Sequence, residues 1–416
     1  MAEFGEAGRQ GKEVRSDCWV KIETKSSGGL RLKVTSKVAI MFGKAIRKLI
    51  KDELAFFDIK NAAVTLEDAG ALPFVMTARI EAAVKRLNPD EKREYLPELL
   101  PWAQYSTARE RFRRSRLYLP GNEPKFMINA GIHKPDGVIL DLEDSVAPAV
   151  KDEALFLVRN ALRQGDFMGS ERMVRINQLP RGLNEIDSLV GCNLHMILIP
   201  KCESPEMVKH VDARIKKAQK LKSSKAQEQI WLMPIIESCL GVFRALEIAQ
   251  ASPNVAALTI GLEDYTADLG TQRTLEAKES FWARSQVVNA ARAAGVQPID
   301  TVFSDIADMD GLRASVLEAK GMGYEGKGCI HPRQIPVIHE AFAPADAEIV
   351  RARKIVVAYR EAEAKGISAV SLGSKMIDPP VVKRALRTVD LALKTGKLAP
   401  NWSSPSYSSD RELGDK

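Results

Sequence analysis

The sequence lacks long hydrophobic runs. Nowhere in its 416 residues is there an uninterrupted apolar stretch of about 18 residues, the length that a helix needs to span a bilayer. The N-terminal segment, MAEFGEAGRQGKEVRSDC, also lacks the apolar core of a signal peptide. We therefore predict a cytoplasmic protein that has no membrane partner.

Cysteine is scarce as well. There are five, they lie far apart and none forms a C-x-x-C pair: Cys18, Cys192, Cys202, Cys239 and Cys329. An odd number at such spacing excludes a disulfide framework and a cysteine zinc site, so we interpret all five as reduced thiols. The five histidines are scattered too, which argues against a zinc hydrolase.

The formal charge of +7 does not come from one basic region. Lysine and arginine alternate with acidic residues along the chain, except in RERFRRSR at 109–116. Because nucleic-acid binding needs basic residues gathered on one surface, we interpret this segment as a solvated linker and predict no nucleic-acid partner.

The N-terminal region has the pattern of a small α+β domain, which we place at residues 1–90. Residues 18–24 and 30–35 alternate apolar and polar side chains around KSSGG, which predicts a β-hairpin. A helix is predicted over 38–54, and the segment that follows reads as strand, turn, strand and then helix to about residue 87. Residues 91–113, rich in charge and proline, are predicted to be a linker.

The central region alternates short apolar runs with helical segments. Eight runs are rich in Val, Ile and Leu: LYL at 117, GVILDLED at 137, MVRIN at 173, MILIPK at 196, LMPIIES at 232, ALTIGLED at 257, QPIDTVF at 297 and GKGCI at 326. Eight β/α units in one domain favour a TIM (β/α)8 barrel over residues 114–345, with a doubly wound open sheet as the alternative. Helices are expected in residues 346–400 and disorder in 401–416.

Polar residues end nearly every apolar run. They are Asp141, Glu143, Asp144, Arg175, Asn177, Lys201, Glu237, Glu263, Asp264, Asp300 and His331. In a TIM barrel these positions meet at one rim, where the acids would repel one another unless a cation lay among them. Oxygen ligands favour Mg²⁺, and Glu237 and Asp264 end successive runs. Helix capping by the acids, and a salt bridge at Arg175, are the alternatives.

From Arg114 to about Leu393 the chain resembles the citrate lyase beta chains of the HpcH/HpaI aldolase and malyl-CoA lyase superfamily. The resemblance rests on RSRLYLPGNEPKF, DGVILDLEDSVAP, VRIN, IPKCESP, PIIESCLGVFRALEIA, IGLEDYTADLG, DTVFSDIADMDGL, GKGCIHPRQI and AVSLGSKMIDPPVV. The first domain resembles the acyl-carrier (gamma) chain of citrate lyase, through SDCWVKIE, FGKAIRKLI and DAGALPFVMTARIEAAV.

The resemblance implies roles for individual residues. Glu237 and Asp264 would bind Mg²⁺, Arg175 would hold the keto-acid product, and Asp378 would be the acid/base residue on a C-terminal lid. Tyr118 and Asp300 would also bind substrate, and four acids would surround the metal ligands without binding the ion: Asp141, Glu143, Asp144 and Glu263. In relatives the lid reaches a neighbouring subunit, which implies a homotrimer or a multiple of three.

The implied activity is Mg²⁺-dependent cleavage of a β-hydroxyacyl thioester of the citryl, citramalyl or malyl type into an acyl thioester and an α-keto acid. One alternative is a malyl- or citramalyl-CoA lyase on free CoA esters, with malate-synthase or thioesterase side activity. Another, of a different class, is a non-catalytic docking scaffold built on the acyl-carrier domain.

The carrier domain departs from the family at S-x-D, the motif whose serine carries the prosthetic arm. Arg15 stands where the serine is expected, and Ser16 directly precedes Asp17. Either Ser16 carries the phosphoribosyl-dephospho-CoA arm, in which case a citrate lyase alpha-type transferase chain is an expected partner, or the domain is unmodified and the substrate is a free CoA thioester. The displaced serine favours the unmodified domain, whereas Glu123 and Asn129, which stand where free-CoA lyases tend to have basic residues, favour the arm, so the two departures point in opposite directions.

Overall fold

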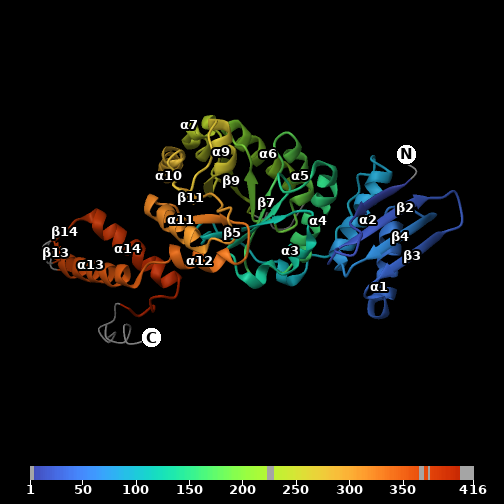
Figure 1. The fold of residues 1–416 in the computed structure, drawn as a ribbon, viewed down its shortest axis with the longest axis horizontal. Helices are drawn as coiled ribbons and strands as arrows, with labels where there is room; N and C mark the ends of the chain where they lie inside the picture. Colours follow the sequence, from blue (N-terminus) through green and yellow to red (C-terminus); the bar gives the residue numbers. More distant parts are fainter. Residues whose placement is uncertain (1–3, 223–228, 365–369, 373–374, 403–416) are drawn as a thin grey trace. The chain divides into compact units, whose positions relative to one another are not determined.

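The computed structural model describes residues 4–222, 229–364, 370–372 and 375–402. The chain divides into two compact units, Met1–Ile338 and His339–Lys416, and each is described separately (Figure 1). In the described residues, no helix combines the length and the apolar character needed to cross a membrane.

The N-terminal domain is a four-stranded sheet with two helices. In spatial order its strands are β1 (Gly5–Gly8), β2 (Cys18–Thr24), β4 (Ala62–Asp68) and β3 (Leu30–Ser36), and its helices are α1 (Ala39–Phe56) and α2 (Pro73–Leu87). β4 pairs antiparallel to β2 and parallel to β3. The central position of β4 agrees with its alternation of buried and half-buried residues, whereas β3 has no fully buried residue.

Two of the predictions for this domain are wrong. β2 and β3 do not form a hairpin, because β4 lies between them; β3, α1 and β4 instead form a parallel crossover, for which the 18-residue α1 is long enough. The second strand predicted after β4 is also absent, because α2 begins at Pro73, a residue whose fixed φ suits the first turn of a helix.

The central domain is a closed barrel of eight parallel strands. They are β5 (Ser115–Pro120), β6 (Gly137–Asp141), β7 (Glu171–Arg175), β8 (Met196–Ile199), β9 (Trp231–Ile236), β10 (Ala257–Ile260), β11 (Gln297–Asp300) and β12 (Gly326–Cys329). Each predicted apolar run overlaps one of these strands. Because β12 pairs with β5, the sheet closes, which confirms the TIM barrel and rules out the open sheet.

Helices follow the strands around the barrel (Figure 1). They are α3 (Pro124–Ile128), α4 (Lys151–Gln164), α5 (Arg181–Leu189), α6 (Pro205–Leu221), α7 (Cys239–Phe243), α8 (Ala245–Ala249), α9 (Leu262–Leu269), α10 (Phe281–Ala294), α11 (Met309–Met322) and α12 (Gln334–Phe342), with short 3-10 turns at Pro101–Ala103, Ala130–His133 and Pro148–Val150. Ile139, Met173, Leu198 and Met233 belong to a fully buried cluster within the barrel. The loops after the strands form one rim, as in other barrels of this kind.

Buried ion pairs attach the N-terminal domain to the barrel. Arg159 of α4 and Glu81 of α2 have fully buried side chains, and Arg159 Nη2 lies 2.6 Å from Glu81 Oε2. Arg79 of α2 pairs with Asp17 of its own domain at 2.9 Å and with Glu153 of α4 at 3.4 Å. The first domain is thus packed on α4 through charges that are shielded from water.

The second unit is built mainly from α13 (Asp346–Ala364) and α14 (Pro379–Lys394), with a hairpin of β13 (Val370–Leu372) and β14 (Lys375–Ile377). Ile355, Val356 and Val389 belong to its buried core. Most of the predicted disordered tail, residues 403–416, lies outside the described residues.

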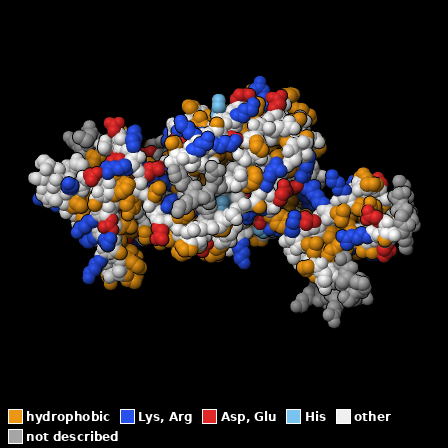
Figure 2. Space-filling model, turned by 180° about the vertical axis from the view of Figure 1, so that it is seen from behind, with side chains coloured by type: hydrophobic (Ala, Val, Ile, Leu, Met, Phe, Trp, Pro, Cys, Tyr) orange, Lys and Arg blue, Asp and Glu red, His pale blue; other side chains and the backbone are white. Residues whose placement is uncertain are grey.

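The surface charges agree with the sequence pattern. On the face shown in Figure 2, lysine and arginine side chains are interspersed with aspartate and glutamate. This face therefore has no broad surface of a single sign.

We expect Glu81→Leu to lower the free energy of unfolding by about 3–5 kcal/mol, because it leaves Arg159 buried without its carboxylate. Urea unfolding followed by circular dichroism would measure the loss. Asp52→Asn is the matched control, because it removes an exposed helical ion pair with Lys48 and should change stability little. Equal effects of the two variants would contradict the importance of the buried pair.

Candidate active site

A cavity of ≈ 350 Å³ opens among the carboxyl ends of the barrel strands. The predicted site residues that line it are Tyr118, Asp141, Asp144, Arg175, Glu237, Glu263 and Asp264. They come from β5, β6 and β7, from the segments that follow β6 and β9, and from the first turn of α9, and the closed barrel brings them to one rim.

Lys201 joins the two residues that are predicted to bind metal. Glu237 follows β9, and Asp264 lies in the first turn of α9, after the neighbouring strand β10. The backbone N–H of Lys201 donates to Glu237 Oε1 at 2.6 Å, and its Nζ lies 3.3 Å from Asp264 Oδ1. Lys201 adopts a positive φ of 45°, a conformation uncommon for a residue with a side chain. It therefore holds both acids at one place.

Glu237 is 5 % exposed, and its environment disfavours its charge. Burial, together with the nearby charges of Asp264 and Glu143, raises the pKa of Glu237 to about 8. A cation beside the carboxylate would offset this penalty. Gly261 leaves the space that the carboxylate occupies, since a Cβ there would lie 2.5 Å from Glu237 Oε2.

These residues fit a hard divalent cation that keeps part of its hydration. Among the described residues, no group of three or more His, Cys, Asp or Glu side chains lies close enough to hold a metal. Mg²⁺ commonly binds through one or two carboxylates and completes its octahedron with water or substrate oxygens. Glu237 and Asp264 supply such a pair.

Arg175 is held in a fixed orientation by acids from β6 and its following loop. Its Nε and Nη2 donate to the two carboxylate oxygens of Asp141 at 2.6 and 2.7 Å, and its Nη1 lies 2.9 Å from Glu143 Oε2. Burial opposes both charges, but the pairing lowers the pKa of Asp141 and raises the pKa of Arg175. The guanidinium also lies over the Tyr118 ring, 5.4 Å from its centroid. The salt-bridge alternative for Arg175 is therefore present in the structure.

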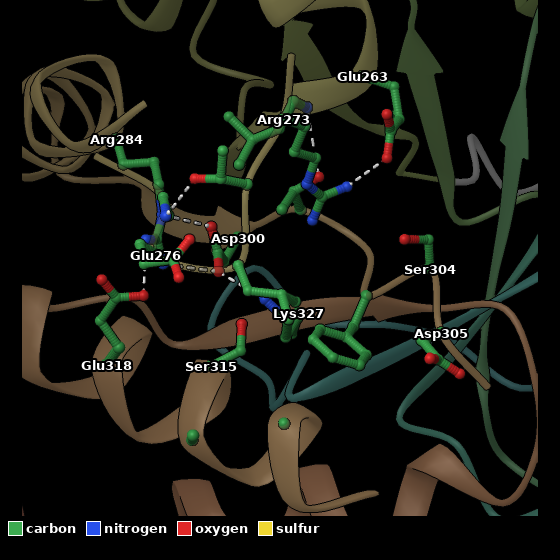
Figure 3. Close-up of a pocket in the computed structure, with 18 residues that line it drawn as sticks. Glu263, Arg273, Glu276, Arg284, Asp300, Ser304, Asp305, Ser315, Glu318 and Lys327 are labelled. Atoms are coloured by element: carbon green, nitrogen blue, oxygen red, sulfur yellow. Dashed lines mark hydrogen bonds and ion pairs between the residues drawn. The ribbon is translucent and has the colours of Figure 1, made fainter. Parts of the chain in front are cut away.

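A second cavity, of ≈ 580 Å³, is shown in Figure 3 and shares Leu262, Glu263 and Thr301 with the first. Asp300 lines this second cavity and does not line the first. Its buried carboxylate lies 2.7 Å from Lys327 Nζ and 3.1 Å from Arg284 Nη2. Burial opposes its charge, but these two cations lower the pKa of Asp300. Glu263 lines both cavities and pairs with Arg273 at 2.6 Å.

Two of the predicted residues lie in other parts of the chain. Ser16 belongs to the N-terminal domain, where its N–H donates to Ala69 O at 3.1 Å and its φ is 57°. Asp378 belongs to the second unit, where Oδ1 accepts the N–H of Val381 at 3.1 Å and so caps α14.

The sequence pattern missed contributions that only the structure shows. Lys201 was recognisable as a residue that ends an apolar run, but nothing in the pattern connects it to Glu237 and Asp264. Arg116 lies in β5 one residue before the LYL run and lines the first cavity. The only signal for Arg116 was a charged residue beside a buried strand.

Fold and site together define a TIM-barrel protein with a carboxylate-rich, cation-binding type of active site at its carboxyl rim. The chain belongs to the HpcH/HpaI aldolase/citrate lyase family, because residues 114–332 match the model of that family. Residues 9–87 match the acyl-carrier family model described as malonate decarboxylase delta subunit (MdcD). The resemblances of both regions are confirmed.

The relatives are carbon–carbon lyases by name. Citrate lyase subunit beta of Leuconostoc mesenteroides subsp. cremoris is 38 % identical over 285 residues, covering 68 % of this chain and 94 % of that protein. The mitochondrial citramalyl-CoA lyase of Mus musculus is 32 % identical over 341 residues, covering 79 % and 96 %. The crystal structure of protein CitE from Mycobacterium tuberculosis in complex with magnesium, acetoacetate and coenzyme A matches with a TM-score of 0.56 at 27 % identity, covering 68 % and 99 %.

We expect Gly261→Ala to weaken Mg²⁺ binding by about tenfold or more, because the new methyl group would displace the Glu237 carboxylate. Isothermal titration with MgCl₂ would measure the change. Gly43→Ala is the matched control, since a Cβ there meets nothing closer than 3.8 Å. Unchanged Mg²⁺ affinity in Gly261→Ala would count against Glu237 as a ligand.

Proposed function

We propose that the protein is a Mg²⁺-dependent carbon–carbon lyase that cleaves a β-hydroxyacyl thioester into an acyl thioester and an α-keto acid. The observation that carries the proposal is that Glu237 and Asp264, which Lys201 joins, line one cavity of the barrel together with Arg175. The family membership and the magnesium in the related CitE complex support it. The substrate is of the citryl, citramalyl or malyl type.

Glu237 and Asp264 would hold Mg²⁺, which supplies a Lewis acid for the oxygen that becomes the keto group. The hydroxyl of the substrate would give its proton to Asp378, the proposed acid/base residue, the bond to the carbon next to the thioester would break, and its electron pair would form the thioester enolate. The enolate carbon then takes up a proton and gives the acyl thioester. The fixed charges around the cavity stabilise the negative charge during this step.

Arg175 would bind the carboxylate of the keto-acid part. Asp141 and Glu143 fix its guanidinium, so its orientation is set before the substrate arrives. Tyr118 lies beside it at the cavity wall. Asp300 would contribute to substrate binding indirectly, through Lys327 and Arg284, with which it pairs.

Asp378 would supply the proton to the enolate carbon, on a lid contributed by a second copy of the chain. This role requires a homo-oligomer, which we propose to be a trimer or a multiple of three. We place the enzyme in the cytoplasm, with a citrate lyase alpha-type transferase chain as a partner only if the carrier arm is present.

A lyase on free CoA esters is the second candidate, and the relation to the mouse citramalyl-CoA lyase favours it. Arg15 occupies the place of the carrier serine, and the backbone of Ser16 sits in the left-handed region. A scaffold without activity is disfavoured, because burial and the neighbouring acids oppose the charge of Glu237, and a bound cation would offset this cost.

We expect Mg²⁺-dependent cleavage of at least one of citryl-, citramalyl- and malyl-CoA, abolished by EDTA. Asp264→Asn should lower kcat/KM by about 100-fold, because it removes one of the two metal ligands. Asp268→Asn is the control on the same helix, since Asp268 accepts the N–H of Cys239 at 2.7 Å and does not line the first cavity. Product formation would be followed as keto acid released. Inactivity on all three esters would refute the proposal.

The intact mass of the protein from its native host tests the carrier domain. We expect the unmodified mass, because Ser16 is displaced by one residue from the family's attachment position. A mass increase that matches the prosthetic arm and disappears in Ser16→Ala would instead show a self-loaded enzyme.

A further inference from the structure

Arg116 is a buried cation at the first cavity. It lies in β5, is 1 % exposed and lines the cavity together with Tyr118 and Arg175. A guanidinium at this depth is costly, because burial removes its hydration. Burial accordingly lowers the pKa of Arg116.

The described part of the chain offers Arg116 only neutral acceptors. Its Nη1 lies 3.1 Å from Met233 Sδ, and its Nη2 donates to Thr259 Oγ1 at 3.3 Å and to the backbone oxygen of Asp300 at 3.2 Å. Its Nε has no hydrogen-bond partner there. None of these acceptors is charged, so the charge of Arg116 is poorly compensated.

Three other buried arginines of this protein have a carboxylate partner, whereas Arg172, like Arg116, donates to neutral oxygens, here those of the Leu162 and Asn193 backbone at 3.2 and 3.3 Å. Arg113 pairs with Glu171 at 2.7 Å, Arg159 with Glu81 at 2.6 Å and Arg284 with Asp300 at 3.1 Å. A buried charge normally has such a partner, because the unpaired form destabilises the fold by several kcal/mol, on the order of 3–5. A partner from outside the chain would give Arg116 what the other three have.

The two guanidinium groups of the cavity also differ from one another. Arg175 already faces the carboxylates of Asp141 and Glu143, so part of its charge is offset. Arg116 reaches across the barrel interior to the acceptors on β9, β10 and β11 and keeps its Nε free of a partner in the described structure. An anionic group entering the cavity would therefore gain more from Arg116 than from a second contact to Arg175.

We propose that Arg116 binds a second carboxylate of the substrate, and so selects a hydroxyacyl thioester whose keto-acid part is a dicarboxylate. This inference rests on the proposed lyase function. It favours the citryl type, which has two carboxylates, over the citramalyl type, in which a methyl group replaces the carboxymethyl group, and over the malyl type, which has one carboxylate. Arg116 is a specificity-determining residue in this assignment, while the bond cleavage belongs to the metal site.

The test compares kcat/KM for citryl-CoA and citramalyl-CoA in the full-length wild-type protein and in Arg116→Met, which keeps the length of the side chain without its charge. We expect the wild-type protein to prefer citryl-CoA, and the ratio of the two kcat/KM values to fall by about 30-fold in the variant, mostly through KM for citryl-CoA. Arg116→Lys, which keeps a cation, should retain part of the preference.

Stability separates this role from a structural one. Because Arg116→Met removes a poorly compensated buried charge, its unfolding midpoint should equal or exceed that of the wild-type protein. A lower midpoint with an equal fall in kcat/KM for both esters would show that Arg116 only supports the fold and would overturn the inference.

The remaining outcomes distinguish this inference from the lyase proposal. A wild-type enzyme that cleaves citramalyl-CoA at least as well as citryl-CoA would overturn the role of Arg116 while the lyase function stands. If no ester is cleaved, calorimetric binding of oxaloacetate and of pyruvate in the presence of Mg²⁺ decides. Tighter binding of oxaloacetate that is lost in Arg116→Met would support the second-carboxylate site, and equal binding of the two keto acids would overturn it.

Discussion

Mutual repulsion among the carboxylates at the barrel rim is the constraint on which the rest of the site depends. The parallel strands place Asp141, Glu237 and Asp264 at one edge of the barrel. If no positive charge lay nearby, their negative charges would destabilise this edge or the carboxylates would become protonated. Basic side chains on or after neighbouring strands offset this negative charge. Arg175 neutralises Asp141, and Lys201 contacts both Glu237 and Asp264.

The compensation at Glu237 is incomplete, and this incompleteness is what makes the site chemically useful. Lys201 contributes a backbone N–H to Glu237 and places its ammonium group at Asp264, so Glu237 remains a buried acid with a raised pKa. In the proposed mechanism a divalent cation would offset this cost. Arg116, in contrast, is a buried cation whose acceptors are all neutral. We therefore propose that the cavity has one place for a cation and one for an anion, which would suit a metal-bound substrate that carries carboxylates.

Pairing of opposite charges also attaches the carrier-like domain to the barrel. Arg159 and Glu81 lie fully buried between α4 and α2, and Arg79 bonds to Asp17, the residue next to Ser16. If a carrier domain separated from the barrel to reach other partners, water would have to hydrate the interface that it exposes. Buried ion pairs of this kind instead make separation costly, because both charges would lose their partner before water could replace it.

Much of the fold is readable from local patterns. The eight apolar runs predict the eight strands, and the polar residue that ends each run identifies the rim, since strand and helix periods depend only on neighbours in sequence. Through resemblance to the family, the motifs GLED and IES predict Asp264 and Glu237 as metal ligands. The hairpin of β2 and β3 was mispredicted, because the pairing of β4 between them is a contact between distant segments.

The sequence by itself therefore determined the class of fold, the family and the types of side chain at the rim, because these follow from the periodicity of apolar residues and from short sequence motifs. Only the tertiary structure decided which charges compensate one another. The pairing of Asp300 with Lys327 and the link from Lys201 to both acids join neighbouring strands, or the segments that follow them, which are distant in sequence. The register of the strands sets these contacts, and no local pattern encodes it.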